Sequence, residues 1–147
     1  MYCEKLSEQL TVADSAAQVT TTSGATTITG TAIDGSEYNR LIAYSIVEVA
    51  KSATAATVSI LWQASVVSGF TGTATSVTTC TMNPITTTAT AAVTTVASCE
   101  ISGEQVQSAR AAEDRYVRAT VTGTVGSAHV LGIEYMVLAD AKRYHPS

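Results

Sequence analysis

The longest charge-free stretch of the chain constrains its fold most. From Ser52 to Cys99 there are 48 consecutive residues without Asp, Glu, Lys or Arg, and 20 of them are Thr or Ser. The stretch also contains large apolar residues such as Ile60, Trp62 and Phe70, whereas disordered segments lack the hydrophobic residues that build a core. Thr and Val are β-branched, which suits strands and disfavours helices. We therefore expect β structure with neutral outward faces, which another protein can approach without desolvating a charge.

Length and charge exclude several classes of protein. A chain of 147 residues normally forms one domain with one core. Its charged share is 14% and its net charge is -4, so we expect no nucleic-acid partner. The most apolar segment, Leu41 to Ala50, contains Ser45 and Glu48, so we expect no membrane partner. The first residues carry no apolar signal-peptide core, and we expect synthesis in a cytosol without export.

Alternation of apolar and polar residues predicts an all-β fold. Thr57 to Ser65 alternates cleanly, with Trp62 on the apolar face, where we interpret it as core rather than as a ligand platform. Arg40 to Ala50 is apolar at most positions, which predicts a strand buried on both faces. Further strands are expected at Thr27 to Ala32, Ser76 to Met82, Thr87 to Ser98, Arg115 to Thr124 and Ala128 to Ala139. The pattern predicts a single-domain jelly roll or β-sandwich of about eight strands.

The segments outside these strands are assigned from local signals. Residues 1–26 are expected to form an N-terminal arm, with one or two helical turns between Cys3 and Leu10, so that the sandwich covers residues 27–147. A turn is expected at Asp34 to Ser36. Ser102 and Gln105 have capping-box spacing, which predicts a short helix over residues 103–112.

The three cysteines, Cys3, Cys80 and Cys99, have no zinc-ligand spacing, and their odd number argues against a disulfide framework. We expect buried or idle thiols. The alternative is a Cys80–Cys99 bridge, which requires that Thr78 to Thr81 pairs with Val96 to Ile101.

No motif predicts catalysis, a cofactor or a metal site. His129 and His145 have no partners at catalytic or metal-ligand spacing. The carboxylates in Asp34 to Glu37 lack the further acids of a calcium loop. Gly69 to Gly72 and Gly123 to Gly126 lack the Lys of a phosphate-binding loop, and we interpret both as turns. We therefore expect no enzymatic activity.

Two features could belong to a contact with another protein. Arg115-Tyr116-Val117-Arg118 combines guanidinium groups with a ring, and is either a solvated strand face or a protein contact. The neutral segment would expose a self-associating surface within Thr71 to Thr95 unless a partner covers it. The candidate interface residues are Thr73, Thr81, Thr88, Thr95, Tyr116 and Arg118.

Four segments carry a family resemblance that spans about residues 30 to 146. They are Tyr38-Asn39-Arg40 leading into Leu41 to Ala50, the Thr57 to Ala64 strand, Arg115 to Ala119, and the ending Ala141-Lys142-Arg143-Tyr144-His145-Pro146. In this order they resemble the capsid decoration, or cement, proteins of tailed bacteriophages. The resemblance implies a jelly roll that trimerises on the outer capsid surface and clamps neighbouring capsomers, without catalytic residues.

Together these observations predict a non-enzymatic virion protein that decorates a phage capsid and bridges subunits of the major capsid protein. We expect a homotrimer on the outer capsid surface, made in the host cytoplasm, with no cofactor and no small-molecule substrate. One alternative is a phage tail-tube or tail-completion subunit, which would form rings or tubes. Another is a secreted adhesin or carbohydrate-binding module, although one Trp and one Phe are few for a sugar-binding surface.

Overall fold

The computed structural model of the chain describes residues 10–50, 56–72, 74–82, 92–102, 104–105, 108, 114–126 and 130–141. Strands dominate these residues, and each strand pair is antiparallel. The elements are β1 (Leu10–Thr21), β2 (Gly24–Thr29), β3 (Ile33–Asp34), the 3-10 helix η1 (Gly35–Glu37), β4 (Tyr38–Ala50), β5 (Thr57–Ser65), β6 (Thr75–Thr81), β7 (Val93–Ile101), β8 (Tyr116–Val125) and β9 (Val130–Ala141). No helix among the described residues is long and apolar enough to cross a membrane.

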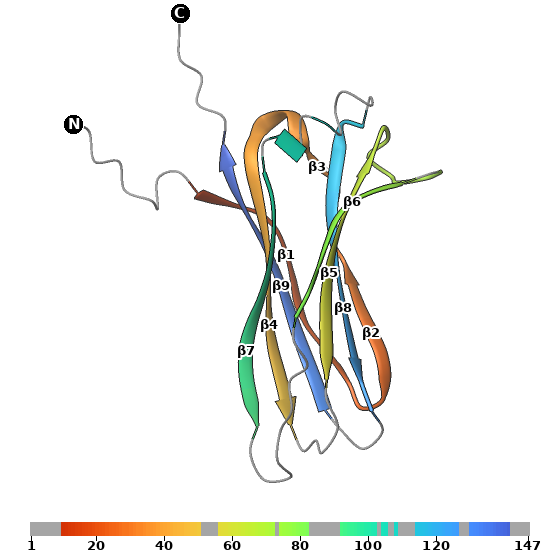
Figure 1. The fold of residues 1–147 in the computed structure, drawn as a ribbon, viewed down its shortest axis with the longest axis vertical. Helices are drawn as coiled ribbons and strands as arrows, with labels where there is room; N and C mark the ends of the chain where they lie inside the picture. Colours follow the sequence, from red (N-terminus) through yellow and green to blue (C-terminus); the bar gives the residue numbers. More distant parts are fainter. Residues whose placement is uncertain are drawn as a thin grey trace, which may run out of the picture.

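The strands form two sheets that lie face to face (Figure 1). Sheet A has the order β1-β9-β4-β7, and sheet B has the order β2-β8-β5-β6 with β3 paired to β8. Most connections between successive long strands cross from one sheet to the other, and β5 and β6 are neighbours within sheet B. Eight long strands in this order make a jelly roll. The predicted all-β fold class is confirmed.

The core lies between the sheets and contains the residues that alternation predicted for β5. Val58, Ile60, Trp62 and Ala64 are all at most 1% exposed. The Trp62 indole N–H donates a hydrogen bond of 3.0 Å to the carbonyl oxygen of Cys99 on β7. Trp62 is therefore a core residue that also links sheet B to sheet A.

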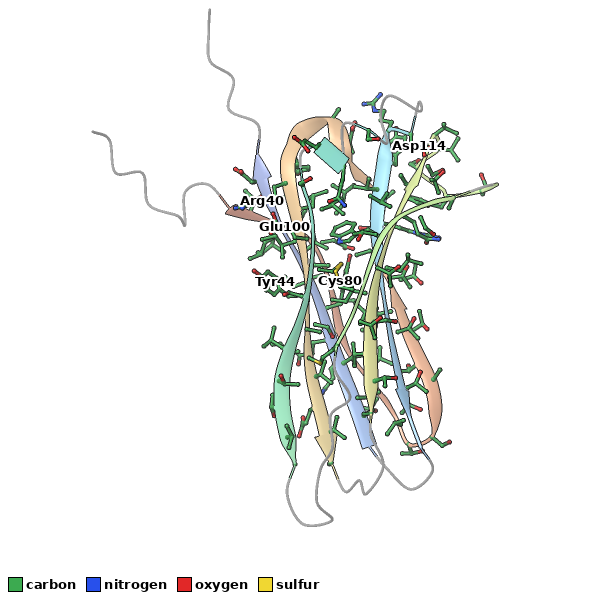
Figure 2. All side chains as sticks on the ribbon, in the orientation of Figure 1. Arg40, Tyr44, Cys80, Glu100 and Asp114 are labelled. Atoms are coloured by element: carbon green, nitrogen blue, oxygen red, sulfur yellow. A yellow bond between two sulfur atoms is a disulfide. The ribbon has the colours of Figure 1, made fainter. Side chains whose placement is uncertain are left out.

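Cys80 and Cys99 form a disulfide, with a Cα–Cα distance of 5.5 Å. The expectation of free thiols is wrong for these two residues. The bridge also forms for a different reason than strand pairing, because β6 and β7 are edge strands of opposite sheets. The disulfide therefore fastens one open edge of the sandwich, and Cys80 lies between the sheets in Figure 2. Cys3 lies outside the described residues.

The predicted N-terminal arm is corrected over residues 10–26, which belong to the two sheets. β1 pairs with β9 over its whole length, with two register shifts, and β2 pairs with β8. Sequence pattern missed β1 because an edge strand with bulges exposes most of its side chains and loses strict alternation. Asp14 fixes β1 further, since its carboxylate accepts a hydrogen bond of 2.8 Å from the backbone N–H of Thr31. The helical turns expected near Cys3 lie outside the described residues.

The strand expected to be buried on both faces is buried on one. Leu41, Ala43, Ser45, Val47 and Val49 of β4 are fully buried. The alternate residues lie on the outer side of sheet A and are half-buried or exposed. Within a single chain nothing described covers that outer side, and its apolar composition becomes a property of the surface.

Two local predictions are confirmed and one is wrong. The carboxylate of Asp34 accepts a hydrogen bond of 2.9 Å from the Ser36 N–H and caps η1, where the turn was expected. Gln105 and Ser102 exchange the two hydrogen bonds of a capping box, and residues 104, 105 and 108 are helical. The other residues of the predicted helix lie outside the described residues. Gly123, by contrast, is not in a turn but inside β8.

Candidate protein interface

The outer side of sheet B carries rows of neutral side chains aligned across its strands. Register places Thr27, Thr122, Ser59 and Thr81 side by side across β2, β8, β5 and β6. The hydroxyls of Thr27 and Thr122 are hydrogen-bonded at 3.3 Å. We call this surface the threonine face; its residues are Thr27, Thr29, Thr57, Ser59, Leu61, Thr79, Thr81, Thr120, Thr122 and Thr124. Arg118 is the single charged residue in the sequences of these four strands.

Arg118 is held rigidly at one end of the threonine face. Its Nε and Nη2 atoms both donate to the side-chain oxygen of Gln63 at 3.2 Å. The guanidinium also lies 4.1 Å from the centroid of the Phe70 ring, a cation–π contact. Phe70 adopts a left-handed φ of 49°, which a non-glycine residue adopts at a cost. The cation is thus positioned by two neighbours rather than free in solvent.

Arg115 and Tyr116 lie beside this end of the face. The Arg115 Nε donates to the Asp34 carboxylate at 2.8 Å, and the guanidinium lies 5.6 Å from the Tyr116 ring centroid. This ion pair and the hydrogen bond from Ser36 lower the pKa of Asp34 to about 2. The Asp34 to Glu37 turn therefore uses its first carboxylate in an ion pair.

The six candidate interface residues do not all lie together. Thr81, Tyr116 and Arg118 are on the outer side of sheet B, with Thr81 exposed and the other two half-buried. Thr95 lies on β7 in sheet A, on the inward side with Ala97, and is half-buried. Thr73 and Thr88 lie outside the described residues. Three of the six therefore share one face.

Sequence reasoning missed a second surface, on the outer side of sheet A. Val12, Ile46 and Val96 are 59%, 44% and 57% exposed. A mostly apolar hollow of about 240 Å³ opens between Tyr44, Ile46 and Met136, and Ser15 and Glu134 also line it. We call this surface the apolar face; its residues are Val12, Ile42, Tyr44, Ile46, Val96, Met136 and Leu138. The signal in the sequence was the apolar content of β4, interpreted as burial within the chain.

Among the described residues, no three His, Cys, Asp or Glu side chains gather closely enough to hold a metal ion. His129 and His145 lie outside those residues. Burial, reinforced by the negative charge of Asp14, raises the pKa of the Tyr135 hydroxyl above its ordinary value. Tyr135 is therefore neutral in the core. Among the described residues, the two outer sheet faces are extended surfaces, one rich in Thr and the other rich in apolar side chains.

The chain matches no protein-family model and no curated protein sequence. Among solved structures it is similar to that of infectious bursal disease virus Gt strain, with 15% identity and a TM-score of 0.50, covering 94% of this chain and 33% of that chain. The structure of the Gx strain is 13% identical, has a TM-score of 0.49, and is matched over 93% of this chain and 32% of that chain. A structure of Bacillus endospore appendages, described as disulfide-linked pili, is 18% identical, has a TM-score of 0.39, and is matched over 92% of this chain and 90% of that chain.

The chain spans about a third of the length of the virus chains it matches. At these identities the likeness shows the fold alone, an all-β jelly roll.

Proposed function

We propose that this chain is a non-enzymatic virion protein that decorates a tailed-phage capsid and stabilises it by bridging subunits of the major capsid protein. It acts as a homotrimer on the outer capsid surface, without a cofactor or small-molecule substrate, after synthesis in the host cytoplasm. The observation that carries the proposal is the threonine face, which spans four strands and contains no charged residue apart from Arg118 at its end.

A neutral face of this kind is suited to a permanent protein contact. Burying a charge costs several kcal/mol unless it is paired, whereas Thr presents a methyl group and a hydroxyl that can donate and accept hydrogen bonds. Soluble proteins usually distribute both signs of charge over their surfaces, which keeps them apart. A face without charge therefore supports assembly rather than independent diffusion. The resemblance to cement proteins supplies the partner.

The capsid and trimer contacts are assigned to Thr81, Tyr116 and Arg118 on the outer side of sheet B. Thr73, Thr88 and Thr95 complete the set on sequence grounds, although Thr95 points inward on β7. Tyr116 and Arg118 suit the centre of a contact, because Tyr and Arg are enriched among residues that dominate binding energy.

Deletion of the gene from its phage, followed by addition of purified protein, tests this role. A protein that binds only the assembled shell stabilises it by mass action. Deletion particles should release DNA at a lower temperature than complete particles, and added protein should restore the release temperature. DNA-binding dye fluorescence during heating gives the measurement. Equal release temperatures in all three samples would refute the proposal.

Substitutions on the threonine face test the surface itself. Thr79→Lys and Thr81→Lys place an ammonium group on exposed positions of β6, and we expect each to weaken particle binding at least about tenfold. Thr81→Ser keeps the position neutral and serves as the matched control, with binding unchanged. Full binding by both folded Lys variants would show that the partner does not use this face.

The disulfide favours one second candidate, a secreted adhesin or other extracellular surface protein. Disulfides form and persist in oxidising surroundings, which include virion surfaces and the cell exterior. The two functions differ in when Cys80 and Cys99 become linked. For a decoration protein, thiol labelling should find both reduced inside the cell and linked in released particles. Linked cysteines in cell-associated protein, exported without particles, would favour the adhesin.

A further inference from the structure

The outward side chains of β4 form an ordered series. Strand alternation directs every second residue of β4 away from the core, and Figure 2 shows Arg40 and Tyr44 on the side of sheet A that faces away from sheet B. The series consists of Arg40, Ile42, Tyr44, Ile46 and Glu48. It has a cation at one end, a carboxylate at the other and three large apolar side chains between them.

The apolar face around this series is larger than one strand. Register places Ile42 beside Leu138, Tyr44 beside Met136, and Ile46 beside Val96. β4 has the continuous apolar composition of a strand covered on both sides, but its outer side is open in the single chain. Contiguous apolar surface on a soluble protein marks a site of association.

The dimensions of the face are sufficient for a specific contact. Eight residue steps from Arg40 to Glu48 cover about 27 Å, and four strands cover about 19 Å. These lengths give about 500 Å² in projection on each copy, or about 1,000 Å² when two copies meet, which is near the lower limit for a specific interface. The expected association is therefore weak, with a Kd in the micromolar range.

The series is complementary to itself when one copy is turned over onto another. A two-fold axis between the stacked sheets, perpendicular to β4 and passing by Tyr44, makes the two β4 strands antiparallel. Tyr44 then faces Tyr44 of the second copy, and Ile42 faces Ile46. Arg40 faces Glu48, twice because of the symmetry. Parallel strands would instead set Arg40 against Arg40 and Glu48 against Glu48.

We propose that the outer face of sheet A binds the same face of a second copy of this chain, in the register that sets Arg40 against Glu48. Two sheets stacked in this way pack about 10 Å apart, as in a sandwich. The contact covers the hollow beside Tyr44 and buries Ile46 from both copies. The same axis sets Val96 against Glu100, which is the ion-pair partner of Arg40 in its own chain. It is independent of the capsid partner, because it uses the sheet opposite the threonine face.

Sedimentation of the full chain between about 1 and about 500 µM tests the contact. The mass should double with concentration, from its value at low concentration, whatever oligomer that value represents. Arg40→Glu and Glu48→Arg should each weaken the doubling at least about tenfold, since each creates two like-charge contacts. The double variant R40E/E48R should recover the doubling, because the charges are exchanged rather than removed.

Further variants distinguish a contact in this register from nonspecific association. The same axis sets Glu134 against Leu138, so Glu134→Gln, which removes a carboxylate from an apolar contact, should tighten the association. Thr79→Lys, a charge change on the opposite face, should leave the doubling unchanged. Circular dichroism and thermal melts identify any variant that fails to fold, which matters for Arg40→Glu because Arg40 lies 3.6 Å from Glu100 of its own chain.

A cross-linking measurement avoids charge changes altogether. In a Cys3→Ser background, Tyr44→Cys lies on the two-fold axis and should link to itself with a short bis-maleimide, whereas Thr122→Cys on the threonine face should not. The proposal is overturned if the mass never doubles, if the double charge exchange behaves like its single components, or if both cysteine variants link equally. If Arg40→Glu and Glu48→Arg lose particle binding while the mass of the wild-type chain never doubles, this face binds a different protein.

Discussion

Gly30 shows how closely a single residue can be fitted in this fold. Its N–H donates 2.9 Å to the Ala119 carbonyl oxygen. A Cβ atom there would collide with the Tyr135 hydroxyl and lie 2.7 Å from the Asp14 carboxylate. Gly30→Ala should therefore lower the free energy of unfolding by about 1–3 kcal/mol, through displacement of the buried ring. Urea denaturation measures the change.

Gly69→Ala is the matched control for that substitution. The nearest atom to a Cβ at Gly69 is the Thr71 methyl carbon at 3.7 Å, an ordinary contact, so its effect should stay within about 0.5 kcal/mol. Equally small losses of unfolding free energy in the two variants would mean that Tyr135 and Asp14 move away from the added methyl group at Gly30 without cost.

The Cys80–Cys99 disulfide is the second feature at the residue scale whose contribution to stability can be measured. Cys80 and Cys99 are 19 residues apart, and a loop of that length predicts about 3 kcal/mol of stabilisation through the unfolded chain. We expect Cys80→Ser/Cys99→Ser to lose about that amount in urea denaturation. A reducing agent should destabilise the wild type similarly and leave the double variant unchanged. Equal stability of both proteins without reductant would contradict the bridge.

At the scale of elements, the ion pair of Asp34 with Arg115 fastens β3 and η1 to the start of β8. The pKa of Asp34 is about 2 in the folded chain, below its ordinary value of 3.8. The pair therefore contributes stability above about pH 4 and loses it as the pH falls through about 2. Because the Arg115 side chain is 60% exposed, we expect less than about 1 kcal/mol.

Asp34→Asn makes this contribution measurable. The difference in unfolding free energy between wild type and variant should be present at pH 6 and reduced to a small fraction at about pH 2, as judged by urea denaturation at several pH values. Arg115→Gln should follow the same profile, because it removes the same pair. A difference that persists unchanged to pH 2 would contradict the lowered pKa of Asp34, because its ion pair and its hydrogen bond from Ser36 both favour the ionised carboxylate.

Elements could be predicted from the sequence wherever their signal is local. β5 and β8 alternate strictly, and the capping box at Ser102 is a short-range motif, so each was found. β1 was missed because its bulges break alternation and its partner β9 follows more than 100 residues later. The Cys80–Cys99 disulfide was expected only as the alternative to free thiols, and through strand pairing, because β6 and β7 meet only when the sheets stack. The apolar composition of β4 could be recognised in the sequence. It does not indicate whether the chain itself or a partner covers these side chains.

At the scale of the whole molecule, the sandwich separates two kinds of surface. Sheet B presents neutral hydroxyl and methyl groups, whereas sheet A presents apolar side chains together with Arg40 and the carboxylates of Glu48, Glu100, Glu134 and Asp140. A chain with a threonine face and an apolar face on opposite sides can contact one protein through the first and a second copy through the other. Its overall charge of -4 then limits aggregation before assembly.

The two faces should respond differently to salt. Screening weakens interactions between charges, so attachment of the threonine face to particles should be unchanged between about 0.05 and 0.5 M NaCl, whereas the difference in doubling between wild type and Arg40→Glu should become smaller. Ammonium sulfate is excluded from protein surfaces and strengthens burial, so it should favour both. Particle co-sedimentation and mass measurements in matched buffers test this. Release of the protein from particles at 0.5 M NaCl would mean that charged groups, Arg118 first among them, dominate the contact instead of the neutral side chains of the threonine face.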